Sequence, residues 1–361
     1  MSTDPAATSA PPTGEPLLTV EDLRVSFAIE EGVVQAVEGV SLSLRPGEIL
    51  AIVGESGSGK SVTAMTLMGL TRSPNTAFEG TAHYKGTELI NAPEDELRRM
   101  RGAEIAMIFQ DPMTSLNPVH KIGAQIVEQI QEHEALPDKQ ARERAIELLE
   151  RVGIPRARER IDNYPFEFSG GMRQRVMIAL ALSCDPSVLI ADEPTTALDV
   201  TIQAQILHRM RELRDETGAA IILVTHDLGV VADIADRIAV MYSGRIVEQG
   251  TLDEIFYDPQ HPYTWGLLGS IARVDRPRPE RLPAIAGMPP SLSDRPEGCH
   301  FRPRCPHEFS KCAEVPPLEA RLEGQPDHRD RCWLSPEEKK ERREVGPGQI
   351  GLEAKSEVGA A

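Results

Sequence analysis

Apolar runs and helical patterns alternate along most of the chain. Nearly unbroken apolar runs occupy residues 49–53, 188–191 and 221–225, which is typical of strands that are buried on both faces. Between residues 201 and 214, apolar side chains recur at helical spacing and predict an amphipathic helix. Short strands that alternate with longer helices predict an α/β domain built on a parallel sheet.

A charge-rich helical pattern interrupts this alternation. One apolar stripe begins at Ile122, and a second covers residues 146–152. Because both stripes have helical spacing, we expect a helical subdomain over about residues 111–168. It would be inserted into an α/β domain that spans residues 17–270.

The two ends of the chain differ from this domain in composition. Residues 1–16 are rich in Ala, Pro, Thr and Ser and lack the basic start and apolar middle of a secretory signal, so we expect a disordered leader. A Pro- and Arg-rich linker opens a small cysteine-rich extension over residues 271–334. Residues 335–361 are charged and weakly hydrophobic, which predicts a disordered tail.

The net charge of the chain limits the classes of partner that it can bind. Acidic residues outnumber basic ones, 56 against 39, and the net charge is -17. This balance argues against broad attraction to nucleic acid or anionic lipid, so we expect no nucleic-acid partner. No apolar run approaches the roughly 20 residues that a helix needs to cross a bilayer. We therefore expect a cytoplasmic protein that does not span a membrane.

A phosphate-binding loop follows the first apolar run. Residues 54–61 read Gly-Glu-Ser-Gly-Ser-Gly-Lys-Ser and match G-x-x-x-x-G-K-[ST] between a predicted strand and a predicted helix. Backbone N–H groups and the helix dipole would hold the phosphates, Lys60 would pair with the β- and γ-phosphates, and Ser61 would bind Mg²⁺. We expect nucleotide contacts from Gly54, Ser56, Gly57, Ser58, Gly59, Lys60, Ser61 and Val62.

Polar side chains end three other predicted strands. Asp192 and Glu193 follow residues 188–191; they could be solvated turn residues, but the Gly54 loop favours Asp192 as a Mg²⁺ ligand and Glu193 as the base that polarises water. His226 ends a strand expected beside that of Asp192, where it would contact the γ-phosphate. Gln110 precedes the helical insertion and would contact Mg²⁺ or water.

A second anion-binding element occurs at Ser169, Gly170 and Gly171. Ser and two glycines at the start of a helical pattern expose backbone N–H groups to an anion. The Gly54 loop already supplies one such site, so the chain has two phosphate-binding ends for one nucleotide.

At these residues the sequence resembles the nucleotide-binding subunits of ABC transporters, over residues 17–270. The resemblance implies a P-loop NTPase fold with antiparallel β and helical subdomains, and two subunits that enclose two ATP head to tail. It also implies a role for each motif: residues 54–61 as the Walker A loop, Gln110 as the Q-loop, residues 168–172 as the signature, Asp192 as the Walker B acid, Glu193 as the catalytic base, Asp199 as the D-loop, His226 as the switch histidine, and Phe27 as the ring that stacks on adenine.

Other stretches resemble the oligopeptide and dipeptide importer branch, specifically its D-type ATPase. The signature has Phe168 and Met172 in place of the commoner Leu and Gln, and residues 110–118, 261–264 and 286–292 match that branch. The Met172 variant leaves the Ser169 and glycine contacts intact but puts a contact by a fifth-position glutamine in doubt.

This resemblance implies an ATPase that powers import of dipeptides or oligopeptides. It implies a heterodimer with a related ATPase, two membrane permease subunits, an extracytoplasmic solute-binding protein reached through the permeases, and a peripheral place on the cytoplasmic face of the membrane. Cargo such as nickel or glutathione, or a non-transport ABC ATPase, remain alternatives. One ATPase unit, no long heptad region and a negative charge favour the transporter.

Four cysteines gather near the C-terminus, with five, six and nineteen residues between them. Four thiolates suit tetrahedral Zn²⁺ or a [4Fe-4S] cluster, and the absence of cysteines paired two to four residues apart favours the cluster. His300, His307 and His328 keep a mixed zinc site open, and unliganded thiols are a third possibility. We expect a structural [4Fe-4S] cluster, with zinc as the alternative, at Cys299, Cys305, Cys312 and Cys332.

Overall fold

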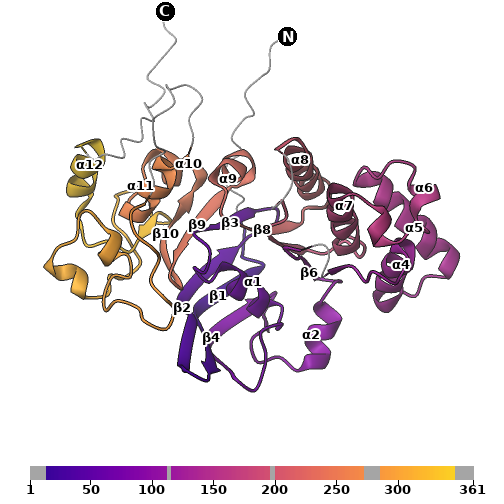
Figure 1. Ribbon diagram of the computed structural model, residues 1–361, viewed down its shortest axis with the longest axis horizontal. Helices are drawn as coiled ribbons and strands as arrows, with labels where there is room; N and C mark the ends of the chain where they lie inside the picture. Colours follow the sequence, from indigo (N-terminus) through magenta and orange to yellow (C-terminus); the bar gives the residue numbers. More distant parts are fainter. Residues whose placement is uncertain (1–13, 112–114, 196–199, 272–284, 346–361) are drawn as a thin grey trace, which may run out of the picture.

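An eight-stranded sheet forms the centre of the computed structural model, which describes residues 14–111, 115–195, 200–271 and 285–345 (Figure 1). The strand order is β11-β12-β10-β9-β3-β8-β7-β6, in which β9, β3, β8, β7 and β6 run parallel. The strands are β3 (Ile49–Val53), β6 (Ile105–Ile108), β7 (Val188–Asp192), β8 (Ala220–Thr225), β9 (Arg237–Tyr242), β10 (Arg245–Thr251), β11 (Glu319–Ala320) and β12 (Arg329–Asp330).

The parallel strands match the apolar runs of the sequence. Every residue of β3, β7 and β8 is buried, because helices and a second sheet cover the two faces. The predicted strands at residues 49–53, 188–191 and 221–225 are confirmed, and so is the expected pairing of the Asp192 and His226 strands, since β7 lies beside β8.

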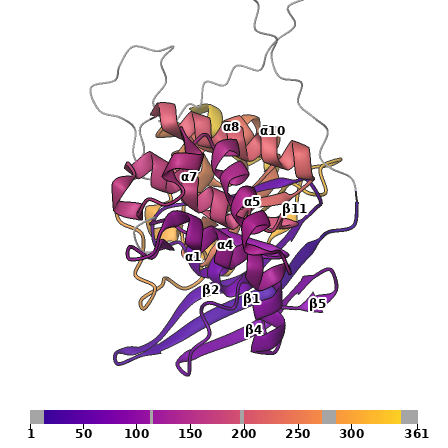
Figure 2. The same cartoon turned by 90° about the vertical axis from the view of Figure 1, so that its right-hand side faces the viewer.

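A smaller antiparallel sheet lies against the central one. Its order is β2-β1-β4-β5, and its strands extend away from the helical part in Figure 2. Apolar side chains of this sheet share one core with α1 and one face of the central sheet. The strands are β1 (Leu18–Ile29), β2 (Gly32–Leu44), β4 (Thr76–Tyr84) and β5 (Thr87–Glu88).

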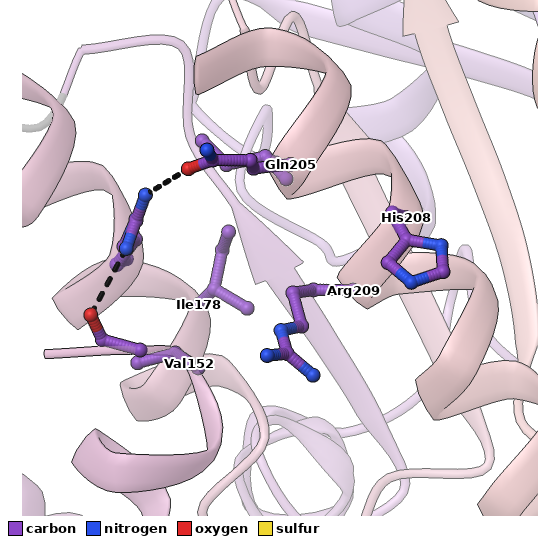
Figure 3. Close-up of a pocket in the computed structure, with 8 residues that line it drawn as sticks. Val152, Ile178, Gln205, His208 and Arg209 are labelled. Carbon is purple, nitrogen blue, oxygen red and sulfur yellow. Dashed lines mark hydrogen bonds between the residues drawn. The ribbon is translucent and has the colours of Figure 1, made fainter. Parts of the chain in front are cut away.

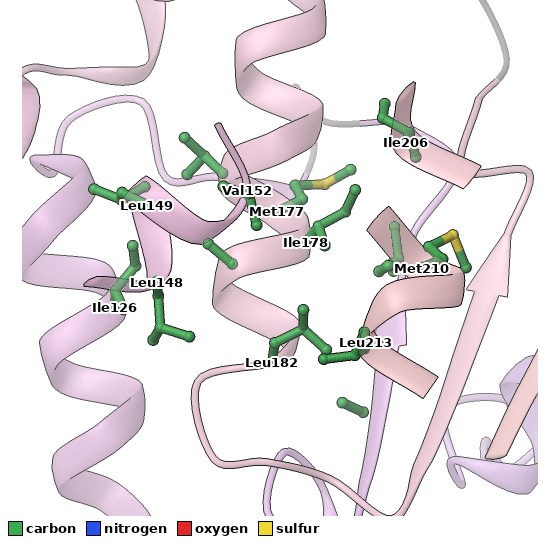
Figure 4. Packing of buried hydrophobic residues seen from close by; sticks show 14 of the residues in the cluster. Ile126, Leu148, Leu149, Val152, Met177, Ile178, Leu182, Ile206, Met210 and Leu213 are labelled. Atoms are coloured by element: carbon green, nitrogen blue, oxygen red, sulfur yellow. The ribbon is translucent and has the colours of Figure 1, made fainter. Parts of the chain in front are cut away.

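The helical insertion packs at the β6 end of the central sheet (Figure 1). Its isoleucine stripe, Ile122, Ile126 and Ile130, is fully buried and faces α5 and α7 across a core that reaches α8 (Figure 4). This part contains α4 (Ile122–His133), α5 (Asp138–Arg151), α6 (Ala157–Arg160) and η1 (Pro165–Glu167), and α7 (Gly170–Ala181) follows it.

The remaining helices cover the central sheet or connect its strands. The amphipathic helix predicted for residues 201–214 is confirmed, with Ile206, Met210 and Leu213 buried. No helix in the described ranges is both long and apolar enough to cross a bilayer. These helices are α1 (Lys60–Leu67), α2 (Glu94–Met100), α8 (Val200–Thr217), α9 (Leu228–Ile234), α10 (Leu252–Tyr257) and α11 (Pro262–Gly269).

The described residues 285–345, here called the C-terminal segment, extend the central sheet. β12 pairs with β10, and β11 pairs with β12, so the segment continues the same sheet at the edge opposite β6. Apart from these strands it contains η2 (Arg302–Arg304), η3 (Ser310–Ala313) and α12 (Pro336–Val345).

The last helix corrects the expectation of a disordered tail from residue 335. Ser335 and Glu338 each accept a hydrogen bond from the other's backbone N–H, which caps the start of α12. Lys339 is buried and donates two 2.7 Å hydrogen bonds to the carboxylate of Asp330. A cap and a buried ion pair thus hold residues that composition alone marks as too polar to fold. Residues 1–13 of the predicted leader and residues 346–361 of the predicted tail lie outside the described residues.

Candidate nucleotide site

The loop of residues 54–59 joins β3 to α1 through conformations that require glycine. Gly54 has a φ of 156°, and a Cβ there would lie 2.1 Å from the carbonyl oxygen of Met241. Gly59 has a φ of 102°, and its Cβ would lie 2.8 Å from the methyl carbon of the same methionine. The glycines therefore let the backbone pass close to β9 before α1 begins.

Lys60 closes this loop from inside. Its side chain is buried, with 4% exposed, and Nζ donates to the carbonyl oxygens of Gly54 at 2.8 Å and Glu55 at 3.0 Å. Burial lowers the pKa of the Lys60 amine, against the opposing charges of Glu193, Asp192 and Glu55. A buried ammonium bound only to neutral carbonyls is well placed to pair with an anion.

Ser61 and Asp192 meet at the carboxyl end of the parallel strands. Ser61 Oγ donates to Asp192 Oδ1 at 2.9 Å. Burial raises the pKa of Asp192, and the charge of Glu193 adds to that shift, while Ser61 and Lys60 oppose it. The pair places a hydroxyl and a carboxylate oxygen together.

Glu193 links the ends of three adjacent strands. Its Oε2 accepts a hydrogen bond from Gln110 Nε2 at 3.1 Å, just after β6, and its Oε1 is hydrogen-bonded to Nδ1 of His226 at 3.2 Å, just after β8. The backbone of Glu193 has a φ of 46°, a strained conformation for a residue that is not glycine. All three candidate catalytic residues therefore meet at one carboxylate.

The second predicted phosphate-binding element is the start of α7. Ser169 caps this helix by accepting a hydrogen bond from the backbone N–H of Met172 at 3.4 Å. Ser169 and Gly170 are exposed, and a Cβ at Gly170 would meet no atom within 4 Å. The hydrogen bonds of the described residues do not connect this element to residues 54–61.

The remaining predicted nucleotide contacts are distributed around the loop. Ser56 and Gly57 are exposed, while Ser58 is buried and Val62 is half-buried. Phe27 is half-buried on β1, opposite Val34 of β2 and Thr76 of β4. Asp199, the predicted D-loop residue, lies outside the described residues.

Two side chains that contact the loop were not predicted from the sequence. Tyr263 Oη accepts a hydrogen bond from the backbone N–H of Glu55 at 2.9 Å, and Arg304 of the C-terminal segment binds both carboxylate oxygens of Glu55. Arg304 is 249 residues from Glu55 in the chain, and no motif or periodicity joins the two.

A cavity of about 290 Å³ lies away from the loop, between α7 and α8 (Figure 3). Arg175 lines it and donates to the carbonyl oxygen of Gly153 at 2.9 Å and to Gln205 Oε1 at 2.5 Å. No residue of the predicted nucleotide site lines this cavity, so its size alone does not mark it as the functional site.

Comparison with known proteins decides the family. A model of the ABC transporter family matches residues 37–196, and a model of the C-terminal region of oligopeptide/dipeptide transporters matches residues 247–312. The oligopeptide transport ATP-binding protein OppD of Salmonella typhimurium is 52% identical over 320 residues, which are 89% of this chain and 95% of that protein. This chain belongs to the ATP-binding subunits of ABC transporters, in the oligopeptide and dipeptide branch.

Other members of the family and its fold agree with this placement. OppD of Bacillus subtilis is 56% identical over 79% of this chain and 80% of its own length, and the dipeptide protein DppD of the same organism is 51% identical over 89% and 95%. A solved dimeric ATP-binding cassette with bound ADP and phosphate matches 65% of this chain and 98% of its own, with 27% identity and a TM-score of 0.59. The cbiO1 subunit of Clostridium perfringens matches 68% and 92%, with 29% identity and a TM-score of 0.57.

The arrangement of the cysteines contradicts the predicted [4Fe-4S] cluster. All of them are free thiols, and four line a cavity of only about 20 Å³ beside Phe301 and Trp333, room for about one water molecule. Within the described ranges, no group of three or more His, Cys, Asp or Glu side chains is placed to hold a metal ion. The iron–sulfur prediction is therefore wrong, and the zinc alternative is excluded by the same finding, for Cys299, Cys305, Cys312 and Cys332.

The surroundings of these thiols give the physical reason. The space that the four thiols line holds about one water molecule, and burial raises the pKa of Cys305 and Cys332 to about 12, so both are neutral thiols near neutral pH. The curated relatives of the family are named as ATP-binding proteins, and their names include no iron–sulfur group. The segment is instead held by packing, hydrogen bonds and ion pairs such as Lys339 with Asp330.

Proposed function

We propose that this chain binds and hydrolyses Mg-ATP to power a membrane importer of oligopeptides or dipeptides. The observation that carries the proposal is the meeting of Gln110 and His226 at the Glu193 carboxylate, beside a buried lysine in a phosphate-binding loop. The curated relatives are ATP-binding proteins of oligopeptide and dipeptide transport, which supports peptides as the cargo.

The donor set at the strand ends fits Mg²⁺. Ser61 offers a hydroxyl oxygen, Asp192 a carboxylate oxygen and Gln110 an amide oxygen, which are the hard ligands that Mg²⁺ prefers. Ser61 and Asp192 are already 2.9 Å apart. When bound, Mg²⁺ would neutralise charge on the β- and γ-phosphate oxygens of ATP.

The protein residues supply positioning and proton transfer. Lys60 pairs with the β- and γ-phosphates, the backbone N–H groups of residues 54–61 surround them, and Phe27 stacks on adenine. Glu193 accepts a proton from the attacking water, with its carboxylate oriented by Gln110. His226, which lies on the opposite carboxylate oxygen, contacts the γ-phosphate.

Completion of the site comes from a second ATPase subunit. The start of α7, where Ser169 and Gly170 are exposed, offers the first backbone N–H groups of a helix to an anion, and we assign these groups to a nucleotide held by another subunit. A second subunit placed head to tail closes its own Ser-Gly-Gly element on the nucleotide held by residues 54–61. The solved cassette that matches this chain is itself a dimer, which supports this arrangement.

The chain works with membrane permeases, as peptide importers of this branch do. We place the ATPase peripherally on the cytoplasmic face of the membrane, as a heterodimer with a related ATPase on two permease subunits. An extracytoplasmic solute-binding protein delivers the peptide to the permeases and has no contact with this chain.

Dilution tests the two-subunit site. ATP turnover per chain is measured for the purified protein over a wide range of concentration, with and without the related ATPase and the permeases. We expect slow turnover for the chain alone, with a rate per chain that rises with concentration and increases in the assembled complex. Full activity of the isolated monomer at high dilution would contradict the proposal.

A further inference from the structure

We infer that Arg304 of the C-terminal segment is a positioning residue for the phosphate-binding loop, and that it acts through Glu55. This inference rests on the proposed function, because it assigns to the C-terminal segment a part in ATP binding. The loop of residues 54–59 is anchored at one end by β3 and at the other by α1; Arg304 would fix it between these two points.

Arg304 and Glu55 form a bidentate pair. Arg304 Nη1 lies 2.6 Å from Glu55 Oε2, and Arg304 Nη2 lies 3.0 Å from Glu55 Oε1. The arginine side chain is only 5% exposed and that of the glutamate 28%. Two parallel charge-assisted hydrogen bonds, with one partner shielded from solvent, form a stronger interaction than an ion pair exposed on the surface.

The arginine itself is held rigidly. Its Nε donates to the carbonyl oxygen of Ala286 at 3.0 Å, and Nη1 also lies 3.3 Å from Tyr242 Oη. The guanidinium lies over the Tyr242 ring, 5.8 Å from its centroid. Phe301 of the same segment packs against Tyr242 and Tyr263, with ring centroids 5.3 Å and 5.4 Å away. The segment therefore presents Arg304 from a packed aromatic base.

Every polar group of Glu55 is held as a result. Its carboxylate is bound by Arg304, its backbone N–H donates to Tyr263 Oη at 2.9 Å, and its carbonyl oxygen accepts from Lys60 Nζ at 3.0 Å. Three parts of the chain, namely the C-terminal segment, α11 and α1, thus converge on one loop residue. Because Gly54 and Gly57 flank Glu55 closely and give the backbone extra freedom, such fixing reduces the ordering cost of binding phosphate.

We expect the loss of Arg304 to change the affinity for ATP more than the rate of hydrolysis. Among the described residues, Arg304 forms its hydrogen bonds and ion pair with Glu55, Tyr242, Ile285 and Ala286 and not with Glu193, so its removal leaves the catalytic carboxylate in place and releases the loop. We expect Arg304→Ala to raise the Kd for Mg-ATP by about tenfold, and the KM with it, while kcat falls by less than about twofold. Arg304→Lys keeps the charge but loses the bidentate geometry, so its Kd should lie between those of the wild type and Arg304→Ala.

A double-mutant cycle in the full-length chain tests the assignment. Mg-ATP binding is measured for wild type, Arg304→Ala, Glu55→Gln and the double variant, together with the unfolding temperature of each. If Arg304 acts through Glu55, each single substitution and the double substitution weaken Mg-ATP binding to the same degree. Arg343→Ala is the matched control, because Arg343 joins the same segment to Asp258 at 2.7 Å without touching the loop; it should leave the Kd unchanged.

Two results would overturn the inference while the proposed function stands. One is wild-type protein that binds Mg-ATP, with Arg304→Ala and Glu55→Gln both binding it equally well. The other is a loss of affinity in Arg304→Ala that Arg343→Ala matches, which would mean a general attachment of the segment. If Arg304→Ala does not fold, the Kd of Glu55→Gln decides alone. Wild-type protein that binds no Mg-ATP would instead refute the proposed function.

Discussion

Ser61 Oγ donates a hydrogen bond to Asp192 Oδ1 at 2.9 Å, which joins the first turn of α1 to the carboxyl end of β7. The two residues lie 131 positions apart in the chain, one at the start of the helix that follows β3 and the other at the end of β7. The hydroxyl and the carboxylate are thus already oriented before any ion arrives, and their response to pH and substitution follows from the burial of Asp192.

Asp192→Asn should weaken Mg²⁺-dependent ATP binding and stabilise the Mg²⁺-free protein. Burial raises the pKa of Asp192, so the folded state holds the proton more tightly than the unfolded state, whose pKa is about 3.9. The cost of ionising Asp192 is therefore absent below that pH and grows as the pH rises through the folded pKa. Thermal unfolding without Mg²⁺ at pH 5 and pH 8 measures it.

The wild-type protein provides the pH control for this substitution. Its Mg²⁺ affinity in the presence of ATP should fall as the pH drops toward the raised pKa, while the Asn variant should show a flatter profile. A variant that is less stable than wild type at pH 8 without Mg²⁺ would mean that the Ser61 contact outweighs the burial of the charge.

Lys60→Ala should weaken ATP binding itself. Among the described residues, the buried ammonium donates only to the carbonyl oxygens of Gly54 and Glu55. Its replacement removes the charge that would pair with the phosphates, so the Kd for ATP should rise by at least about tenfold. Equilibrium binding of Mg-ATP measures the change. Lys85→Ala is the control, since Lys85 forms an ion pair with Glu104, with a distance of 2.9 Å between Nζ and Oε2, and this pair is not part of the loop. An equal loss of ATP affinity in both variants would contradict the role assigned to Lys60.

Lys339→Ala should destabilise the protein by about 3 kcal/mol at pH 8, because it leaves the buried carboxylate of Asp330 without its partner. Burial raises the pKa of Asp330 to about 6, so below pH 6 the carboxyl is protonated in the wild type as well, and the loss should shrink. Denaturant unfolding at pH 8 and pH 5 measures the difference. Lys340→Ala, the exposed neighbour on α12, should change stability by less than about 0.5 kcal/mol.

Much of the catalytic half of the molecule could be predicted from the sequence, because short motifs at the ends of buried strands mark the functional residues. The apolar run before Gly54 and the acids after residue 191 each mark the end of a buried strand, and parallel strands bring such ends to one edge. The contact of Glu193 with Gln110 and His226 follows from that rule.

The C-terminal segment could not be predicted in the same way. The pairing of Arg304 with Glu55 depends on how distant parts pack, and no spacing in the chain encodes it. The cysteines suggested a metal because their number fits one, but the space that they enclose is too small. Residues 336–345 read as a disordered tail by composition, although a cap and one buried lysine suffice to fold them.

Glu193→Gln in the assembled transporter tests the central claim most directly. The substitution keeps the shape of the side chain but removes its basicity, so ATP turnover should fall by about a hundredfold or more while Mg-ATP binding stays intact. Glu216→Gln, on an exposed ion pair with Arg151, controls for loss of a carboxylate elsewhere and should hydrolyse ATP at the wild-type rate. Near-normal turnover in the Glu193→Gln transporter would contradict the assignment of Glu193 as the base.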